Sequence, residues 1–452
     1  MMRDEIERLR RAMRKENVQA TIIPTSDFHG SEQIAARFML RKYLSGFTGS
    51  AGTLVVTLDE AALWTDGRYF LQAGIELSGS GIELMKIGEK STPTIEKYLL
   101  EKMPENSALG FDGRTFSFDY VNRLKQTLHA KNISFFDDID FGSYVWEDRP
   151  GFPTEPVFEL GEQFCGEPRA EKIARIREKM NEENADCLVV SSLDEIAWTL
   201  NLRANHADFS FCFYGFMLIF RDKSDTILFA DKIIFSPEIL GQLEADGIEL
   251  HGYAQIYDEL KAIRGKVWID KKSSNYLLVS SVDNENIIDK PSPIELMKAV
   301  KNPTEILCER NAHLRDGVAV TRFMRWLKTE VSQEKITEIS AAEKLEEFRR
   351  SSDRYLIPSF APIIAYGKHG AVVHYSATEA TNAVIEPHVL LLSDTGGHYI
   401  DGTTDVTRTF VLGEITDEEK RAFTLVLAGH LNLLLAKFPE GIRGSALDYA
   451  AR

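Results

Sequence analysis

In the stretch Leu390-Leu-Leu-Ser-Asp394-Thr-Gly-Gly-His-Tyr-Ile-Asp401-Gly-Thr-Thr-Asp405-Val-Thr-Arg408-Thr-Phe410, two aspartates are separated by a Gly-rich segment. An apolar run ends at Asp394, a Thr-Gly-Gly turn follows, and a second run rich in Thr, Val and Phe comes after Asp405. This pattern predicts a β-hairpin that brings the two aspartates onto neighbouring strands. Oxygen donors fixed on adjacent strands suit a divalent cation such as Mn²⁺, Co²⁺ or Mg²⁺.

A polar hairpin that carries aspartates for turn formation is the alternative interpretation, because Asp is common in turns. Asp401, between the other two, is expected to be such a turn residue. We expect Thr407 and Arg408 to orient Asp405 through hydrogen bonds.

A second polar segment lies upstream, in Ser359-Phe-Ala-Pro-Ile-Ile-Ala-Tyr366-Gly-Lys-His369-Gly-Ala-Val-Val-His374-Tyr375. The imidazole of His374 could donate a hydrogen bond at neutral pH, or it could be a structural histidine near the end of an apolar strand. A metal site made of His369 and His374 is rejected, because a spacing of five on a strand puts side chains on opposite faces. His369 is therefore expected to be a loop residue.

The composition is that of a large globular chain. Its 452 residues, 44% of them apolar and 27% charged, provide material for about three domains. A net charge of −16 argues against nucleic acid or an anionic membrane as the main partner. The charged N-terminus and the lack of eighteen consecutive apolar residues predict no signal peptide, no membrane span and a cytoplasmic location. The longest apolar run, Phe211 to Phe220, is expected to be a buried strand. Scattered cysteines predict reduced thiols, with no disulfide framework and no zinc motif.

A duplicated unit emerges when the sequence is shifted by 167 residues. The first copy has the helical stripe Ile6, Leu9 and Met13, the strand 20–23 and then Asp27. The second copy has the stripe Ile173, Ile176 and Met180, the strand 187–190 and then Asp194. Any two helix-then-strand units share some likeness, but agreement of stripe, strand and aspartate at one offset favours two related α/β domains.

Breakers divide the chain into domains 1–153, 154–301 and 302–452. The first ends at Pro150-Gly-Phe-Pro153, and the third begins at Asn302-Pro303, where Asn can cap a helix and Pro fits its first turn. Within the first domain, segments 53–57 and 61–65 are expected to form a hairpin. The Gly-rich segment 46–52 lacks the Lys and the helix context of a phosphate loop, so nucleotide binding is not expected.

The stretch 390–410 resembles the metal-binding signature of aminopeptidase P, the Xaa-Pro aminopeptidase branch of the pita-bread metallopeptidases, family M24. Segments 45–53, 64–72 and 193–203 resemble the same family, which extends the resemblance over nearly the whole chain. It implies a mixed α/β (α+β) fold, in which two creatinase-like N-terminal α/β domains precede the first half of a pita-bread catalytic domain. The usual Gly-Ser-Asp continuation after Arg203 is absent, which leaves the contacts of the second domain open.

The resemblance also assigns roles to individual residues. Asp394 is expected to chelate one metal ion and Asp405 to bridge two, with Mn²⁺ as the expected metal. His374 is expected to donate to the substrate carbonyl and to help hold the tetrahedral intermediate, and Arg68 to contact the bound peptide. The implied activity is two-metal hydrolysis that releases the first residue from peptides with proline in the second position, by an enzyme that is a homodimer when intact.

One part of the family signature is missing from this sequence. The family completes its site with one His and two Glu, carried by a His-Gly-x-Gly-His-Gly segment and two later strands, and no such segment is present. Three of five ligands are thus absent, and the sequence is interpreted as an aminopeptidase P cut short inside its catalytic domain and inactive alone. The helix expected over 423–435 should then expose an apolar face.

Two other functions remain open at this point. The chain could be a non-catalytic peptide-binding or interaction protein with the pita-bread fold. It could also be another enzyme of the superfamily, such as a prolidase, a creatinase or a methionine aminopeptidase. The duplicated N-terminal domains and the signature around Asp405 argue against the latter, and retention of His374, Asp394 and Asp405 argues against the former.

Overall fold

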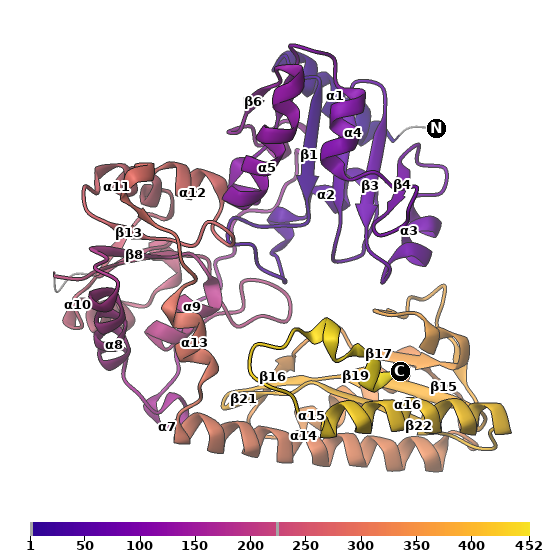
Figure 1. Cartoon of the computed structure of the whole chain (residues 1–452). Helices are drawn as coiled ribbons and strands as arrows, with labels where there is room; N and C mark the ends of the chain where they lie inside the picture. Colours follow the sequence, from indigo (N-terminus) through magenta and orange to yellow (C-terminus); the bar gives the residue numbers. More distant parts are fainter. Residues whose placement is uncertain (1–2, 223–225) are drawn as a thin grey trace. The chain divides into compact units, whose positions relative to one another are not determined.

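The chain folds into two compact units in this computed structural model, which describes residues 3–222 and 226–452. The first unit comprises Met1–Arg310 with Ile400–Gly402, and the second comprises Asn311–Tyr399 with Thr403–Arg452. Figure 1 shows the sheets and helices of each unit along the chain. The domain boundaries predicted after residues 153 and 301 remain predictions.

Two six-stranded mixed sheets with the same topology build the first unit. The strand orders are β4-β3-β2-β1-β5-β6 and β12-β11-β10-β8-β13-β14. In each sheet the first strand pairs antiparallel with the second and parallel with the fifth, and the third pairs parallel with the fourth. The strands of the first sheet are β1 (Ala20–Pro24), β2 (Thr53–Thr57), β3 (Ala61–Thr65), β4 (Glu83–Lys86), β5 (Ala108–Gly110) and β6 (Ser134–Phe136). Those of the second are β8 (Cys187–Val190), β10 (Phe216–Phe220), β11 (Thr226–Phe229), β12 (Ile248–His251), β13 (Val267–Trp268) and β14 (Ile287–Ile288).

This shared topology confirms the predicted duplication. The first strands begin at Ala20 and Cys187, which differ by the predicted offset. The equivalence ends soon afterwards, because Asp27 lies in a loop whereas Asp194 lies in helix α9.

Helices cover both faces of each sheet in the first unit. The predicted stripe of α1, formed by Ile6, Leu9 and Met13, is fully buried in the core on one face of the first sheet. The main helices around the first sheet are α1 (Asp4–Lys15), α2 (Leu40–Ser45), α3 (Phe70–Glu76), α4 (Ile95–Lys102), α5 (Phe118–Leu128) and α6 (Gly142–Val145). Those around the second are α8 (Arg169–Glu182), α9 (Leu193–Leu200), α10 (Pro237–Ala245), α11 (Ile256–Ala262), α12 (Tyr276–Ser280) and α13 (Pro293–Ala299). A short pair, β7 (Phe158–Glu159) and β9 (Leu202–Arg203), and the helix α7 (Glu162–Cys165) complete this unit.

The expected hairpin of the first domain is confirmed, since β2 and β3 pair antiparallel. The expected strand over residues 211–220 is confirmed only from Phe216 onward. Residues 211–215 precede the strand and are not part of it. The Tyr214 N–H donates to His206 Nδ1 at 3.2 Å, and the His206 N–H donates to the Cys212 carbonyl at 3.3 Å, so this segment is bonded to a loop.

The two halves of the first unit share one apolar core. Phe28 and Phe38, from the first copy, lie in the same buried cluster as Phe216 and Phe229 of the second. Next to Phe28, His29 donates through Nδ1–H to the Ser191 carbonyl at 2.7 Å, while its Nε2 accepts from a tyrosine hydroxyl of the second copy. Apolar burial and paired polar groups therefore join the copies.

The second unit begins within the long helix α14 (Pro303–Glu330). The predicted cap is confirmed, because the Glu305 N–H donates to Asn302 Oδ1 at 2.9 Å and the Asn302 N–H donates back to Glu305 Oε2 at 2.8 Å. A core built around Phe323, Leu391 and Phe410 joins α14, α15 (Glu338–Arg350) and the strands. Those strands are β15 (Ile336–Thr337), β17 (Ile363–Tyr366), β18 (Val384–Ile385), β19 (Leu390–Thr395) and β22 (Val406–Val411). A separate three-stranded sheet is formed by β16 (Tyr355–Pro358), β20 (Gly397–Tyr399) and β21 (Gly402–Thr403).

The last long helix, α16 (Asp417–Leu435), exposes a row of apolar side chains, as predicted for this region. Val426 is 74% exposed and Leu435 is 75% exposed. The short helix α17 (Asp448–Ala451) packs against Gly429 of α16. No helix within residues 3–222 and 226–452 has the length and apolarity needed to cross a bilayer.

Self-association should depend on this apolar row, because contiguous exposed apolar surface favours contact between copies. We expect the variant Val426→Lys/Leu434→Lys to lower the weight-average mass in sedimentation velocity, with a free energy of unfolding within about 0.5 kcal/mol of the parent. Leu296→Lys on α13, a single residue that is 71% exposed, is the control and should change neither value. Equal association of all three proteins would contradict the expectation.

The buried carboxyl of Glu195 should make the free energy of unfolding depend on pH. Burial raises the pKa of its carboxyl to about 7, although the Ser292 hydroxyl donates to it at 2.7 Å. Because the folded chain holds this proton more tightly than the unfolded chain, the contribution to the free energy of unfolding is present below about pH 4.5 and is lost as the pH rises through about 7. Glu195→Gln should thus stabilise the protein by about 1–3 kcal/mol near pH 8 and by much less at acidic pH, measured by urea unfolding. Glu244→Gln, an exposed change on α10, is the control, and an equal effect of Glu195→Gln at both pH values would contradict this reasoning.

Candidate active site

The central strand of the three-stranded sheet β17-β19-β22 carries Asp394. Side chains along β19 alternate in burial: Leu391, Ser393 and Thr395 face the interior, while Asp394 is half-buried on the other face. Asp394 lies directly opposite Thr407 of β22. Its Oδ1 accepts a hydrogen bond from Thr407 Oγ1 at 2.7 Å, which fixes the carboxylate on the open face.

Asp405 lies immediately before β22, two residues from Thr407. Because side chains two apart on an extended chain point the same way, Asp405 and Thr407 share the face that carries Asp394. The two carboxylates interact: partial desolvation and then the negative charge of Asp394 raise the pKa of Asp405. The prediction that both aspartates come from neighbouring strands is thus confirmed, with Asp405 at the strand edge.

The predicted Thr-Gly-Gly turn is wrong, because the chain does not reverse at Gly396. It continues into β20 and turns at residues 400–401, so the expectation that Asp401 is a turn residue is confirmed. The base of this excursion is closed by Gly397 and Thr404, whose N–H groups donate to Thr404 Oγ1 and to the Gly397 carbonyl, each at 2.9 Å. A Cβ on Gly396 would lie 2.0 Å from the Thr404 carbonyl oxygen, so glycine is needed for this close approach.

A buried ion pair supports β19 from behind. Arg349 and Asp316 are 2% and 0% exposed, and Arg349 Nε donates to Asp316 Oδ1 at 2.7 Å. Arg349 Nη2 also donates to Thr395 Oγ1 at 3.1 Å, and the Tyr399 hydroxyl donates to Asp316 Oδ1 at 3.0 Å. The ion pair therefore links α14 and α15 to Thr395 and Tyr399, which lie on either side of Gly396, where the chain leaves the β19–β22 pairing. This point is called the break in the hairpin.

The expected role of Thr407 and Arg408 needs correction. Thr407 orients Asp394 and not Asp405, because the register places it opposite Asp394. Arg408 Nη1 donates to the Thr407 carbonyl at 2.7 Å. Its guanidinium therefore holds the strand backbone.

His374 lies beyond the end of β17, after the 3₁₀ turn Gly367–Ala371, and is exposed. It is thus in a loop and not near the end of a strand. His369 lies in that 3₁₀ turn, so the strand geometry used to reject a His369/His374 metal site does not apply. The His369 ring instead meets a carboxylate: its Nδ1 is 2.8 Å from Glu338 Oε1.

Arg68 belongs to the first unit, where it follows β3. Its guanidinium makes two hydrogen bonds to the Asp66 carboxylate, each at 2.8 Å, and lies over the Tyr69 ring. The bonds to Asp66 raise the pKa of Arg68, while the side chain stays 40% exposed. Its predicted contact with a bound peptide remains a prediction.

Asp394 and Asp405 lie on one face, and their negative charges repel each other. A hard divalent cation between the two carboxylates would relieve this repulsion, so the pair fits such an ion. Across residues 3–222 and 226–452, no group of three or more His, Cys, Asp or Glu side chains gathers as a metal site would require. Two carboxylates alone would bind such a cation weakly.

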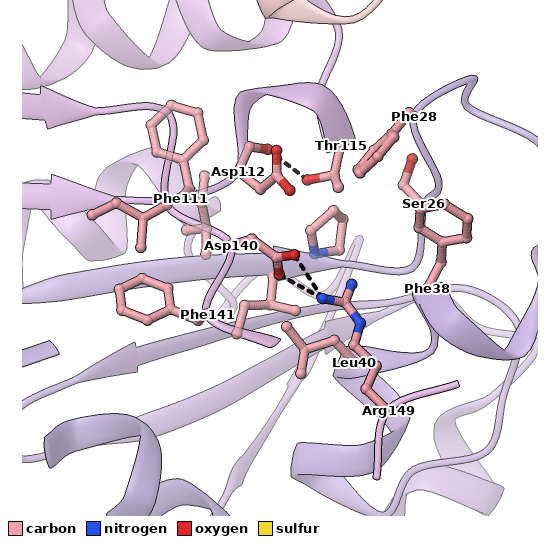
Figure 2. A pocket seen from close by; sticks show the side chains of 14 residues that line it. Ser26, Phe28, Phe38, Leu40, Phe111, Asp112, Thr115, Asp140, Phe141 and Arg149 are labelled. Carbon is pink, nitrogen blue, oxygen red and sulfur yellow. Dashed lines mark hydrogen bonds and ion pairs between the residues drawn. The ribbon is translucent and has the colours of Figure 1, made fainter. Parts of the chain in front are cut away.

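A pocket in the first unit offers no comparable chemistry. It lies at the carboxyl ends of β1 and β5 and is lined by phenylalanines with two aspartates and Arg149 (Figure 2). Its carboxylates are already engaged: Arg149 pairs with Asp140, and Arg114 pairs with Asp112.

Models of known families match three successive segments. The Creatinase/Prolidase N-terminal domain matches residues 5–140 and again 148–305, and Metallopeptidase family M24 matches residues 308–452. Xaa-Pro aminopeptidase 1 of Dictyostelium discoideum is 38% identical, covering 99% of this chain and 73% of its own length. The chain belongs to the Xaa-Pro aminopeptidases of family M24.

Further relatives agree. Xaa-Pro aminopeptidase ApepP of Drosophila melanogaster is 36% identical, over 96% of this chain and 72% of its own length. The crystal structure of X-prolyl aminopeptidase from Caenorhabditis elegans superimposes with a TM-score of 0.94 at 32% identity, covering 99% of this chain and 76% of that one. That protein is described as a cytosolic enzyme with a di-nuclear active site. The inferred resemblance and the fold of two creatinase-like domains before an M24 domain are confirmed.

The support of the M24 hairpin by Arg349 can be tested by stability. Arg349→Met leaves Asp316 buried without its partner and should lower the free energy of unfolding by about 3–5 kcal/mol, measured in urea. The double variant Arg349→Met/Asp316→Leu should recover much of this loss, because no buried charge remains.

Arg350→Met is the matched control, since Arg350 forms an exposed pair with Glu346, and it should cost less than about 1 kcal/mol. If the double variant were no more stable than Arg349→Met, the buried charge would not be the cause of the loss.

Proposed function

We propose that this chain carries catalytic parts of an aminopeptidase that releases the first residue from peptides with proline in the second position. Similarity over nearly the whole chain to proteins named Xaa-Pro aminopeptidases supports this substrate class. The observation that carries the proposal is the shared open face of β19 and β22, where Asp394 and Asp405 interact in a domain of the M24 family.

In this proposal Asp394 and Asp405 hold divalent metal, with Mn²⁺ as the preferred ion and two ions in the complete site. The di-nuclear site ascribed to the Caenorhabditis elegans enzyme supports the number. Bound divalent cations would supply an activated water molecule and polarise the peptide carbonyl. Thr407 holds Asp394 in place, and the strand register keeps Asp405 beside it.

His374 takes the role of a hydrogen-bond donor to the carbonyl that is attacked. Its exposure and its place on a loop allow contact with a peptide. Both the neutral and the protonated imidazole can donate a hydrogen bond. Either form can therefore stabilise the negative charge that develops on the carbonyl oxygen during attack. Arg68 is proposed to bind the peptide from the first domain, since its exposed guanidinium suits a carbonyl or a carboxylate.

Cellular context is proposed by analogy. The description of the Caenorhabditis elegans enzyme as cytosolic supports a cytoplasmic protein. A homodimer is proposed from the family resemblance alone.

The carboxylate pair predicts weak but specific Mn²⁺ binding. In a titration followed by the electron paramagnetic resonance of free Mn²⁺, we expect Asp394→Asn and Asp405→Asn each to lower the affinity about tenfold or more, because each removes one of two charged ligands. Asp417→Asn, an exposed aspartate on α16, is the control and should bind as the parent does. Equal affinities for all four proteins would exclude these aspartates as ligands.

The unmodified 452-residue chain can also be assayed for peptidase activity. Because the described residues offer no third ligand side chain, we expect Mn²⁺-dependent release of the first residue from an Xaa-Pro peptide to be far below the typical turnover of about 1–10³ s⁻¹. Turnover within that range would show that two carboxylates suffice and would correct the proposal on this point.

A non-catalytic peptide-binding function is the second candidate, because the exposed imidazole of His374 could contact a peptide without a metal ion. It requires that an Xaa-Pro peptide binds to the metal-free chain. Calorimetric binding with no hydrolysis would support this function, whereas hydrolysis with Mn²⁺ would support the first.

A further inference from the structure

Segment 367–383, which connects β17 to β18, carries His374 in a strained backbone conformation. The φ angle of His374 is 57°, in the left-handed region that costs a residue other than glycine about 1–3 kcal/mol. The neighbouring residues 371–374 are largely exposed, so apolar packing does not explain why the loop keeps this shape.

A single buried carboxylate anchors this segment. Glu338, the first residue of α15, is 0% exposed. Its Oε1 accepts from the Tyr366 N–H at 2.8 Å and from His369 Nδ1–H at 2.8 Å. Its Oε2 accepts from the Tyr375 hydroxyl at 2.7 Å and from the Ala383 N–H at 3.0 Å. The four donors come from both ends of the segment and from the two sides of His374.

The rings of His369 and Tyr375 complete the anchor. They stack with centroids 4.5 Å apart and an interplanar angle of 26°. Both rings are bonded to Glu338, so the backbone between them is held at its two ends while His374 projects from it. One backbone N–H donates to each oxygen of Glu338, so both oxygens must act as acceptors. An amide in the same place would offer one acceptor and turn a donor toward two other donors.

We propose that Glu338 is a positioning residue that sets the place of His374 for the substrate through His369 and Tyr375. This inference rests on the proposed function of His374. Glu338 itself is fully buried, so it acts through the two rings that contact it. It also gives His369, which the sequence marks only as a loop residue, a defined task.

The test uses the full chain with its ten histidines labelled with ¹⁵N and ¹³C in the ring, with the His374 signal assigned by its loss in His374→Ala. Glu338→Gln should broaden or split the His374 ring signal. Glu346→Gln, the same change on the same helix in contact with Tyr355, is the control and should leave the signal unchanged. An unchanged His374 signal in folded Glu338→Gln would overturn the inference.

Tyr375→Phe is the second variant, in case Glu338→Gln does not fold. It removes one donor and keeps Glu338 with its other three bonds, so it should disturb the His374 signal in the same direction but less. If the signal of folded Tyr375→Phe matched the parent, the ring anchor would be refuted.

A binding cycle separates this inference from the proposed function. We expect Glu338→Gln to weaken binding of the dipeptide Ala-Pro by no more than His374→Ala does, about 2- to 10-fold for one hydrogen bond, and to have no further effect in the His374→Ala background. If His374→Ala binds as the parent does, the proposed role of His374 fails, while a disturbed His374 signal in Glu338→Gln still supports the anchor. If both variants weaken binding additively, Glu338 does not act through His374, and the inference is overturned.

Discussion

The register between β19 and β22 is the constraint on which the candidate site depends. A slip of one residue would turn Asp394 into the core and Ser393 outward. The register is held on the core side, where Leu391 and Phe410 lie opposite each other and are both buried. It is held at the break in the hairpin by the paired bonds between Gly397 and Thr404. Apolar packing on one face thus fixes two charged groups on the other.

Three buried charged side chains support the structure around the hairpin. Arg349 with Asp316 holds the end of β19, and Glu338 holds the loop after β17. Each would be costly if unpaired, but each has several hydrogen-bond partners. A buried charge is satisfied only in the local conformation that brings its hydrogen-bond partners to it. It therefore stabilises that conformation relative to alternative ones. Such groups suit a region in which an aspartate pair and an exposed histidine need defined places.

The sequence predicts the parts that follow from local pattern and repetition. Apolar periodicity and the positions of turn and capping residues predict four of these features. They are the duplicated sheets, the hairpin β2–β3, the cap at Asn302 and the neighbouring strands of Asp394 and Asp405. The loop after β17 is not predicted, because its shape depends on Glu338. A glutamate at the start of a helix is usually solvent-exposed and favourable to the helix dipole, so nothing in the sequence marks it as buried. The sequence also predicts the wrong aspartate for Thr407, because only the strand register decides which carboxylate it faces.

The core shared by the two creatinase-like domains has a consequence for how they unfold. The copies differ at Asp27 and Asp194: the first accepts from the Tyr214 hydroxyl of the other copy, and the second pairs with Lys298. Phe28 and Phe38 are part of a core that the second copy completes. The first copy alone would leave these rings uncovered, so the two copies are expected to unfold as one cooperative piece.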